Sequence, residues 1–277
     1  MSRSRFAAWL ALSIAVAQGF SPASGFSPAR GFSPARGSCF LLYQIGSGQQ
    51  RRDPSTTCAT RVAPQSTFKV PHAIAALDAG VITEQESIPY DGHPVDFEAW
   101  RRPHTLPTAM RFSVVWFFQE IARRLGLDRE RAYLERFQYG NRDPSSGLTT
   151  FWLGGSLAIS PDEQQQFLLK LFGPGFPAAA VAVDTVKRIL VQPKNAVVNA
   201  LGEQPFASPW PQDAVLRAKT GSGRAADGGQ VRWLIGHVQR DARAWVFVSD
   251  VIGGTDTPAD AAVRLAERAL VDERVLR

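Results

Sequence analysis

Hydrophobic residues change their spacing along the chain, and the change separates extended from helical segments. A short apolar run at residues 40–45, followed by glycines, predicts a strand. Residues 66–136 have helical spacing, and within them 105–126 are predicted as one helix. A polar, turn-rich loop is expected at 140–147, and Ser160-Pro161 predicts the start of another helix.

The last third of the chain switches to the period of strands. Residues 215–218, 231–238 and 244–252 are predicted as strands, and the last two form a hairpin with a polar turn. A final helix is expected from 257 to about 276. This order indicates an α+β fold: an antiparallel sheet flanked by helices, with a mostly helical second subdomain at roughly 66–190.

The N-terminal residues have the pattern of a secretory signal peptide. Two arginines precede an apolar run that ends in Ala15-Val16-Ala17, so residues 1–17 are expected to be removed. Residues 18–38 repeat a Phe-Ser-Pro-Ala unit three times and are expected to be a flexible lead-in. The folded domain is therefore expected at 39–277, in the periplasm. We expect no membrane segment in its mature form, because no later apolar run is long enough to cross a bilayer.

Charge and cysteine content narrow the function classes. The formal charge is +6, but the basic residues are scattered, which argues against nucleic-acid binding. Export and an even count favour a disulfide between Cys39 and Cys58, with two reduced thiols as the alternative. The cysteines lack the paired histidines of a zinc site, so no metal is expected. Monomer and homodimer both remain open.

The candidate chemistry begins in the stretch from Gln65 to Lys69. Residues three apart on a helix share one face, so the Ser66 hydroxyl and the Lys69 amine are expected to lie one turn apart. A helix N-terminus favours developing negative charge, which suits a serine nucleophile beside an amine base. The plainer alternative is a helix-capping serine with an exposed lysine, although the apolar neighbours Phe68 and Val70 argue against it.

Further motifs follow in a fixed order: Ser113-Val114-Val115, Tyr139-Gly140-Asn141, Phe151-Trp152-Leu153 and Lys219-Thr220-Gly221. Together with Ser66-Thr67-Phe68-Lys69, they make the chain resemble the class D serine β-lactamases, the oxacillinase family, from about Cys39 to the final helix. The resemblance implies the β-lactamase/transpeptidase-like fold. It also implies hydrolysis of β-lactam antibiotics through a serine acyl-enzyme, and hence antibiotic resistance.

The resemblance further implies how water is activated. Val115 stands where the S-D-N motif of class A enzymes and penicillin-binding proteins has Asn, and no acidic base is apparent, so Lys69 is the candidate. The family carries a carbamate on this lysine (N6-carboxylysine), so carbon dioxide or bicarbonate is its source and no other cofactor is expected. The pKa of Lys69 is expected to fall because its neighbours are apolar, namely Phe68, Val115, Trp152 and Leu153. The Trp152 indole is implied to hydrogen-bond the carbamate; a core aromatic is the alternative.

Roles for the other motif residues follow from the same resemblance. Ser113 is implied to relay a proton to the β-lactam nitrogen, with Lys219 as its electrostatic partner; the alternatives are a helix hydroxyl bonded to its own backbone and an exposed lysine. Backbone N–H groups of Ser66 and Ser222 are implied to form the oxyanion hole. The remaining substrate-binding candidates are Val115, Leu153, Thr220, Gly221 and Ser222, with Tyr139 and Asn141 as supports for which a plain turn is the alternative.

One position departs from the family pattern. Many oxacillinases place an Arg two residues after a Pro near the final helix, to bind the substrate carboxylate, whereas this chain has Asp260 after Pro258. Asp260 is expected to pair with Arg264, one turn further on. Either Arg264 or Arg224 is then expected to bind the carboxylate, or the hydroxyls of Thr220 and Ser222 do more of this work.

Other functions remain in competition. A sensor domain with this site acylates and then stalls, but such domains normally follow transmembrane segments, which this sequence lacks. A D-Ala-D-Ala transpeptidase or carboxypeptidase is disfavoured by Val115 and by the context of Trp152. A structural protein with chance motifs is disfavoured by five matches in order.

Overall fold

The computed structural model describes residues 37–53, 56–225 and 228–277. The expected signal peptide lies outside the described residues, as does the expected lead-in except for its last two positions. Those two positions, Gly37 and Ser38, already belong to the first strand. Among the described residues, none of the helices combines the length and apolarity that a membrane span requires.

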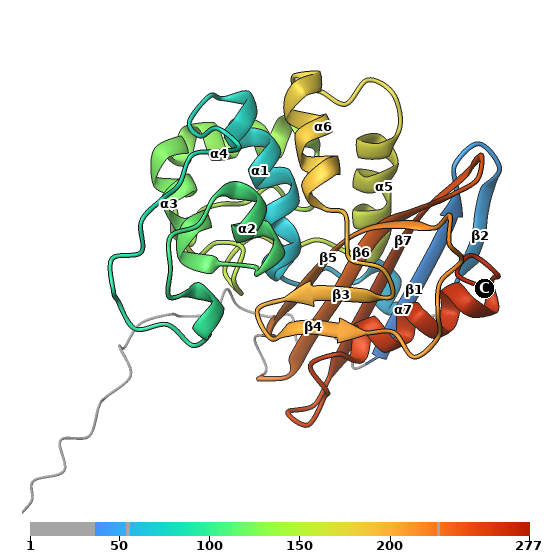
Figure 1. The fold of residues 1–277 in the computed structure, drawn as a ribbon. Coiled ribbons are helices and arrows are strands. Elements are labelled where there is room, and N and C mark those ends of the chain that lie inside the picture. The colour runs from blue at the N-terminus through green and yellow to red at the C-terminus, as the bar shows by residue number, and fades with distance from the viewer. Residues whose placement is uncertain (1–36, 54–55, 226–227) are drawn as a thin grey trace, which may run out of the picture. The chain divides into compact units, whose positions relative to one another are not determined.

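The centre of the domain is a five-stranded antiparallel sheet with the strand order β2-β1-β7-β6-β5. Its first and last strands along the chain are far apart in sequence, and β1 pairs with β7 along its full length. Figure 1 shows these strands side by side. The strands are β1 (Gly37–Gln44), β2 (Gly48–Arg52), β5 (Val215–Arg224), β6 (Gln230–Arg240) and β7 (Arg243–Gly253).

Helices form the middle of the chain and its end, as predicted (Figure 1). Six of them fall between the first strands and β5: α1 (Lys69–Asp78), α2 (Leu106–Arg111), α3 (Val115–Leu125), α4 (Leu127–Phe137), α5 (Pro161–Phe172) and α6 (Ala180–Ile189). Helix α5 begins with a capping box in which the Ser160 hydroxyl accepts from Glu163 N at 3.2 Å. The last helix is α7 (Ala261–Asp272).

Alternate residues of the strands face two separate apolar clusters. In β6, Leu234 belongs to the cluster that contains Ala266 and Leu270 of α7, whereas Trp233 and Ile235 belong to the cluster of the helical subdomain. This alternation follows from the period of two along a strand. It explains why the late strands are apolar on consecutive positions: both faces of the sheet are covered.

The predicted helix at 105–126 is wrong in one respect that matters for the site. Helix α2 ends at Arg111 and α3 begins at Val115, and Ser113 between them has a left-handed backbone with φ of +57°. A helix cannot continue through a left-handed residue. The hydrophobic spacing on either side is helical, so the break cannot be seen in the periodicity.

Three strands were not predicted. Strand β2 reads Gly-Gln-Gln-Arg-Arg, an edge strand without apolar residues. Strands β3 (Ala196–Asn199) and β4 (Gly202–Pro205) pair only with each other, in a short hairpin outside the main sheet. Strand β5 was predicted too short, since it continues past Ala218 through the whole Lys-Thr-Gly motif to Arg224.

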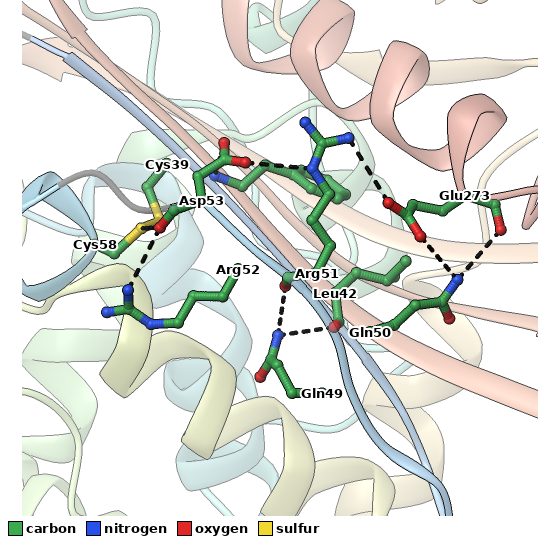
Figure 2. Close-up of polar contacts among 10 residues, drawn as sticks. Cys39, Leu42, Gln49, Gln50, Arg51, Arg52, Asp53, Cys58 and Glu273 are labelled. Atoms are coloured by element: carbon green, nitrogen blue, oxygen red, sulfur yellow. Dashed lines mark hydrogen bonds and ion pairs between the residues drawn. A yellow bond between two sulfur atoms is a disulfide. The ribbon is translucent and has the colours of Figure 1, made fainter.

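The two cysteines are joined. Cys39 of β1 forms a disulfide with Cys58 in the 3-10 helix Thr56–Ala59. Figure 2 shows this bond next to Asp53, whose carboxylate accepts from Phe40 N at 3.1 Å and pairs with Arg51. The structure therefore favours the disulfide over two reduced thiols, and it ties the segment before Ser66 to the central sheet.

Candidate active site

Ser66 lies in the 3-10 helix Gln65–Phe68, which runs directly into α1 and places Lys69 at the first position of that helix. The Lys69 Nζ is 2.7 Å from the Ser66 Oγ, within hydrogen-bond distance. The spacing that suggested a shared helical face therefore brings the two groups together. The amine is placed to take a proton from the hydroxyl.

Lys69 is fully buried, unlike an ordinary lysine. Burial lowers its pKa well below the usual value for a lysine, and the positive charge of Lys219 lowers it further. The ring of Phe118, which the sequence did not single out, lies 5.5 Å from the amine. The site therefore favours the uncharged amine, which is the form that can act as a base.

Ser113 and Lys219 form a second hydroxyl–amine pair. Lys219 Nζ donates to Ser113 Oγ at 2.9 Å and to the carbonyl of Thr220 at 2.9 Å. Burial lowers the pKa of Lys219 to about 7. The left-handed backbone of Ser113 gives its hydroxyl this direction at the break between α2 and α3. Neither alternative from the sequence, an exposed lysine or a mid-helix hydroxyl, describes this geometry.

The hydroxyls line a common cavity of about 410 Å³. Its wall contains the predicted residues Ser66, Ser113, Val115, Leu153, Thr220 and Ser222. A larger cavity of about 900 Å³ lies between α7 and the β3–β4 hairpin, but none of the motif residues lines it. The smaller cavity is therefore the candidate active site.

The backbone of β5 presents Ser222 N–H to its open edge. In this strand, Ala218 N donates to Leu190 O, outside the sheet. Alternate residues of a strand point their N–H groups to the same side, so Ser222 N–H points away from β6 as well. It is thus free of the β5–β6 ladder, and Ser222 lines the cavity that contains Ser66.

Gly221 does not line the cavity, contrary to its predicted role in binding substrate. A Cβ atom at this position would lie 3.0 Å from Pro64 O and 3.1 Å from the Thr67 side chain. The glycine therefore allows β5 to pack closely against the segment that carries Ser66.

Trp152 is fully buried beneath the site rather than on the wall of the cavity. Its ring packs against Phe68 and His72, with centroid separations of 5.6 and 5.4 Å. These two residues flank Lys69 along the chain. The indole Nε1 is buried without a hydrogen-bond partner among the described residues. A buried donor without a partner is costly.

Tyr139 and Asn141 lie behind the site as supports and do not line the cavity, so they are not substrate-binding residues. Gln164 Nε2 donates to the Tyr139 hydroxyl at 3.0 Å and to Thr67 Oγ1 at 2.8 Å, so Tyr139 supports the residue next to Ser66. Asn141 donates to Ser156 O at 2.7 Å and accepts from Ala158 N at 2.9 Å. Asn141 therefore closes the loop that carries Trp152.

We expect Tyr139→Phe to lower stability and leave KM within about twofold of the wild type. The substitution leaves a buried Gln164 N–H without its acceptor, which costs about 1–3 kcal/mol. Thermal unfolding and steady-state kinetics on the same preparation test this. A raised KM with unchanged thermal stability would instead indicate contact with substrate.

Arg264 does not reach the candidate site, which corrects the expectation that it takes over carboxylate binding. Its Nε lies 2.6 Å from Asp260 Oδ2, so the predicted Asp260–Arg264 pair forms. Arg264 lines the larger cavity beside α7 and not the cavity of Ser66.

Arg264→Ala is accordingly expected to leave KM unchanged. The pair is exposed and i,i+4 on a helix, so its loss costs about 0.5 kcal/mol of stability or less. Initial rates over a range of substrate concentrations measure the effect, with Arg268→Ala on the same helix as a control. A severalfold rise in KM for Arg264→Ala alone would show that Arg264 contributes to substrate binding.

Sequence reasoning missed several residues of the cavity wall: Phe97, Trp100, Asn199, Leu201 and Arg232. The first two lie in or next to a short 3-10 helix, Glu98–Trp100, within an irregular segment that has no periodicity to read. Asn199 and Leu201 belong to the unpredicted β3–β4 hairpin. Among the described residues, no cluster of His, Cys, Asp or Glu is suited to hold a metal ion.

Comparison with known proteins identifies the relatives of this chain. The model of the penicillin-binding protein transpeptidase domain matches residues 43–270. Beta-lactamase OXA-1 from Escherichia coli is 33% identical over 241 residues, which cover 84% of this chain and 82% of that protein. Beta-lactamase OXA-48 from Klebsiella pneumoniae is 31% identical over 214 residues, covering 77% and 74% of the two chains.

Solved structures agree with the sequence relatives. The class D β-lactamase BAT-2 has a TM-score of 0.75 and 30% sequence identity, covering 87% of this chain and 93% of its own. A class D β-lactamase from Bacillus subtilis has a TM-score of 0.75 and 29% identity, covering 88% and 94%. With its fold, its ordered motifs and its serine–lysine pair, the chain belongs to the class D β-lactamases, a family of serine hydrolases.

Proposed function

We propose that this protein hydrolyses β-lactam antibiotics through an acyl-enzyme on Ser66 and thereby confers resistance to them. The observation that carries the proposal is the 2.7 Å approach of Lys69 Nζ to Ser66 Oγ, made by an amine that is fully buried. The N-terminal sequence supports a place of action in the periplasm.

In the acylation step, Lys69 takes the proton of Ser66 and the Oγ attacks the β-lactam carbonyl. Lys69 then passes this proton to Lys219, so that it is unprotonated again before deacylation. The N–H groups of Ser66 and Ser222 are proposed to stabilise the oxyanion, at about 3 kcal/mol per donor. As the C–N bond breaks, Ser113 gives its proton to the leaving nitrogen and is reprotonated from Lys219. A pKa of about 7 lets Lys219 give up a proton near neutral pH.

For deacylation, we propose that Lys69 carries a carbamate. The buried, uncharged amine is the form that reacts with carbon dioxide, and the Trp152 indole is a buried donor without a partner among the described residues. Trp152 is the residue proposed to hold the modified side chain. No carboxylate occurs among the described residues that line the cavity, so the wall itself offers no oxygen base. A carbamate on Lys69 supplies such a base for the hydrolytic water.

Added bicarbonate is therefore expected to raise kcat, and acidic pH to lower it. Acid protonates the Lys69 amine, and a protonated amine cannot hold carbon dioxide. Rates in degassed buffer and in buffer with bicarbonate, measured from pH 5 to 8, test this expectation. Equal rates in the two buffers across that range would contradict the carbamate.

Turnover of a chromogenic cephalosporin tests the function itself. A β-lactamase gives many product molecules per enzyme at a steady rate. A single stoichiometric burst without further turnover would instead indicate a penicillin-binding sensor. Release of D-alanine from a peptide ending in D-Ala-D-Ala, without β-lactam turnover, would indicate a cell-wall enzyme.

A further inference from the structure

We propose that Arg232 binds the carboxylate of the substrate, the group next to the β-lactam nitrogen. This inference rests on the proposed function and identifies how the site selects anionic substrates. Asp260 stands where the family pattern places the carboxylate-binding arginine, so another residue must bind the carboxylate here. Arg264, one turn further along α7, is paired with Asp260 and lines a different cavity.

The register of the sheet brings Arg232 to the active site. Arg232 of β6 is directly opposite Ser222 of β5. Side chains that face each other across an antiparallel pair lie on the same face of the sheet, with Cβ atoms about 5 Å apart. Arg232 and Ser222 both line the cavity that contains Ser66. A substrate acylated at Ser66 and lying along β5 therefore extends towards this guanidinium.

The charge of Arg232 is not balanced within the described part of the chain, where no acidic group lies within ion-pair distance. Its N–H groups donate instead to neutral acceptors: Gln230 Oε1 at 2.9 Å and the carbonyls of Val231, Gly223, Pro258 and Thr257 at 3.1–3.5 Å. The side chain is half-buried, and burial lowers the pKa of Arg232. A carboxylate beside it gains a charge-assisted hydrogen bond that neutral carbonyls cannot supply.

The carbonyl contacts also hold the guanidinium in place before substrate arrives. A side chain that is already ordered loses less entropy on binding than a mobile one. The shortest contact is to the Gln230 side chain, which itself lines the cavity and can rotate aside for a carboxylate. Binding therefore requires one side-chain movement and no change in the sheet.

Arg224 is the other cation on the cavity wall, and it is less suited to this role. It is exposed at the end of β5. An exposed guanidinium is screened by salt and pays more side-chain entropy, so its ion pairs contribute little. Arg224 is therefore the weaker of the two candidates on this cavity wall.

The test compares a penicillin with its methyl ester, which lacks the negative charge. Dissociation constants are measured in a Ser66→Ala background, so the result does not depend on turnover. Adding Arg232→Ala is expected to weaken binding of the free acid by about 10- to 100-fold, the effect of losing a hydrogen bond to a charged group. Binding of the ester is expected to change less than about twofold. Arg232→Lys is expected to retain part of the preference for the acid. Arg264→Ala serves as the control, because Arg264 lines the other cavity, and it is expected to retain nearly all of the preference.

Two results would overturn the inference. One is unchanged binding of the free acid after Arg232→Ala. The other is an equal loss for acid and ester, which would show that Arg232 only supports the β5–β6 hairpin. The proposed function is tested separately, by turnover of the same penicillin with Ser66 intact, so either claim can fail while the other stands.

Discussion

Replacing Lys69 with methionine is expected to lower kcat by about 10³- to 10⁴-fold, near the upper end of what general bases contribute. Methionine keeps the length and volume of the side chain but removes the amine that lies 2.7 Å from Ser66 Oγ. No carboxylate lines the cavity among the described residues, so no other group there replaces the base for deacylation. Because Lys69 also takes the proton of Ser66, acylation should be slowed as well, and any acylated protein that mass spectrometry detects after addition of a penicillin is expected to persist.

The same substitution is expected to stabilise the fold. Lys69 is fully buried, and its folded pKa lies below its unfolded value of about 10.4. Between these two values the unfolded state binds more protons, so wild-type stability rises with pH in that window and falls towards neutrality. Lys69→Met removes this penalty, which should raise Tm at neutral pH and flatten its pH dependence. Replacing a functional residue that lowers the stability of the fold commonly raises that stability.

Lys194→Met is the control, because Lys194 is exposed and lies outside the cavity. It should alter neither kcat nor the pH dependence of Tm. Retention of more than a tenth of wild-type turnover by Lys69→Met would exclude Lys69 as the base.

Trp152→Phe is expected to lower kcat by about 10²-fold while the protein remains folded. Phenylalanine preserves the ring contacts with Phe68 and His72, but it removes the indole N–H, which has no partner among the described residues. If that N–H holds the carbamate, its loss should make activity depend more steeply on bicarbonate. Saturating bicarbonate should then restore part of the lost rate.

Trp210→Phe provides a matched control. Trp210 is also buried with an indole N–H that is unpartnered in the described residues, but it packs in the cluster on the α7 side of the sheet. It should keep wild-type kcat and the wild-type response to bicarbonate. If both variants lose activity equally, the effect of Trp152→Phe is one of packing.

Local patterns were sufficient for most of the fold. The late strands, the capping of α5 and the pairing of Asp260 with Arg264 follow from interactions a few residues apart. The break at Ser113 did not follow, because a left-handed residue leaves no trace in hydrophobic spacing. Strand β2 was missed for a similar reason: an exposed edge strand needs no apolar residues.

In the candidate site, too, some contacts could be predicted from local spacing and others could not. Ser66 and Lys69 are neighbours in sequence, so their contact could be predicted from helical spacing. The contact of Lys219 with Ser113 joins residues 106 positions apart and was expected only from the family resemblance. Arg232 reaches the cavity because of the β5–β6 register, whereas Arg264 lines the other cavity. Such three-dimensional relations require the assembled sheet.

The most direct measurement is a carbon-13 NMR spectrum of the protein in labelled bicarbonate at neutral pH. The buried, uncharged Lys69 predicts one protein-bound carbamate resonance that disappears on acidification, returns on neutralisation and is absent from Lys69→Met. A protein that turns over β-lactams without that resonance, or that keeps it after Lys69→Met, would contradict the account.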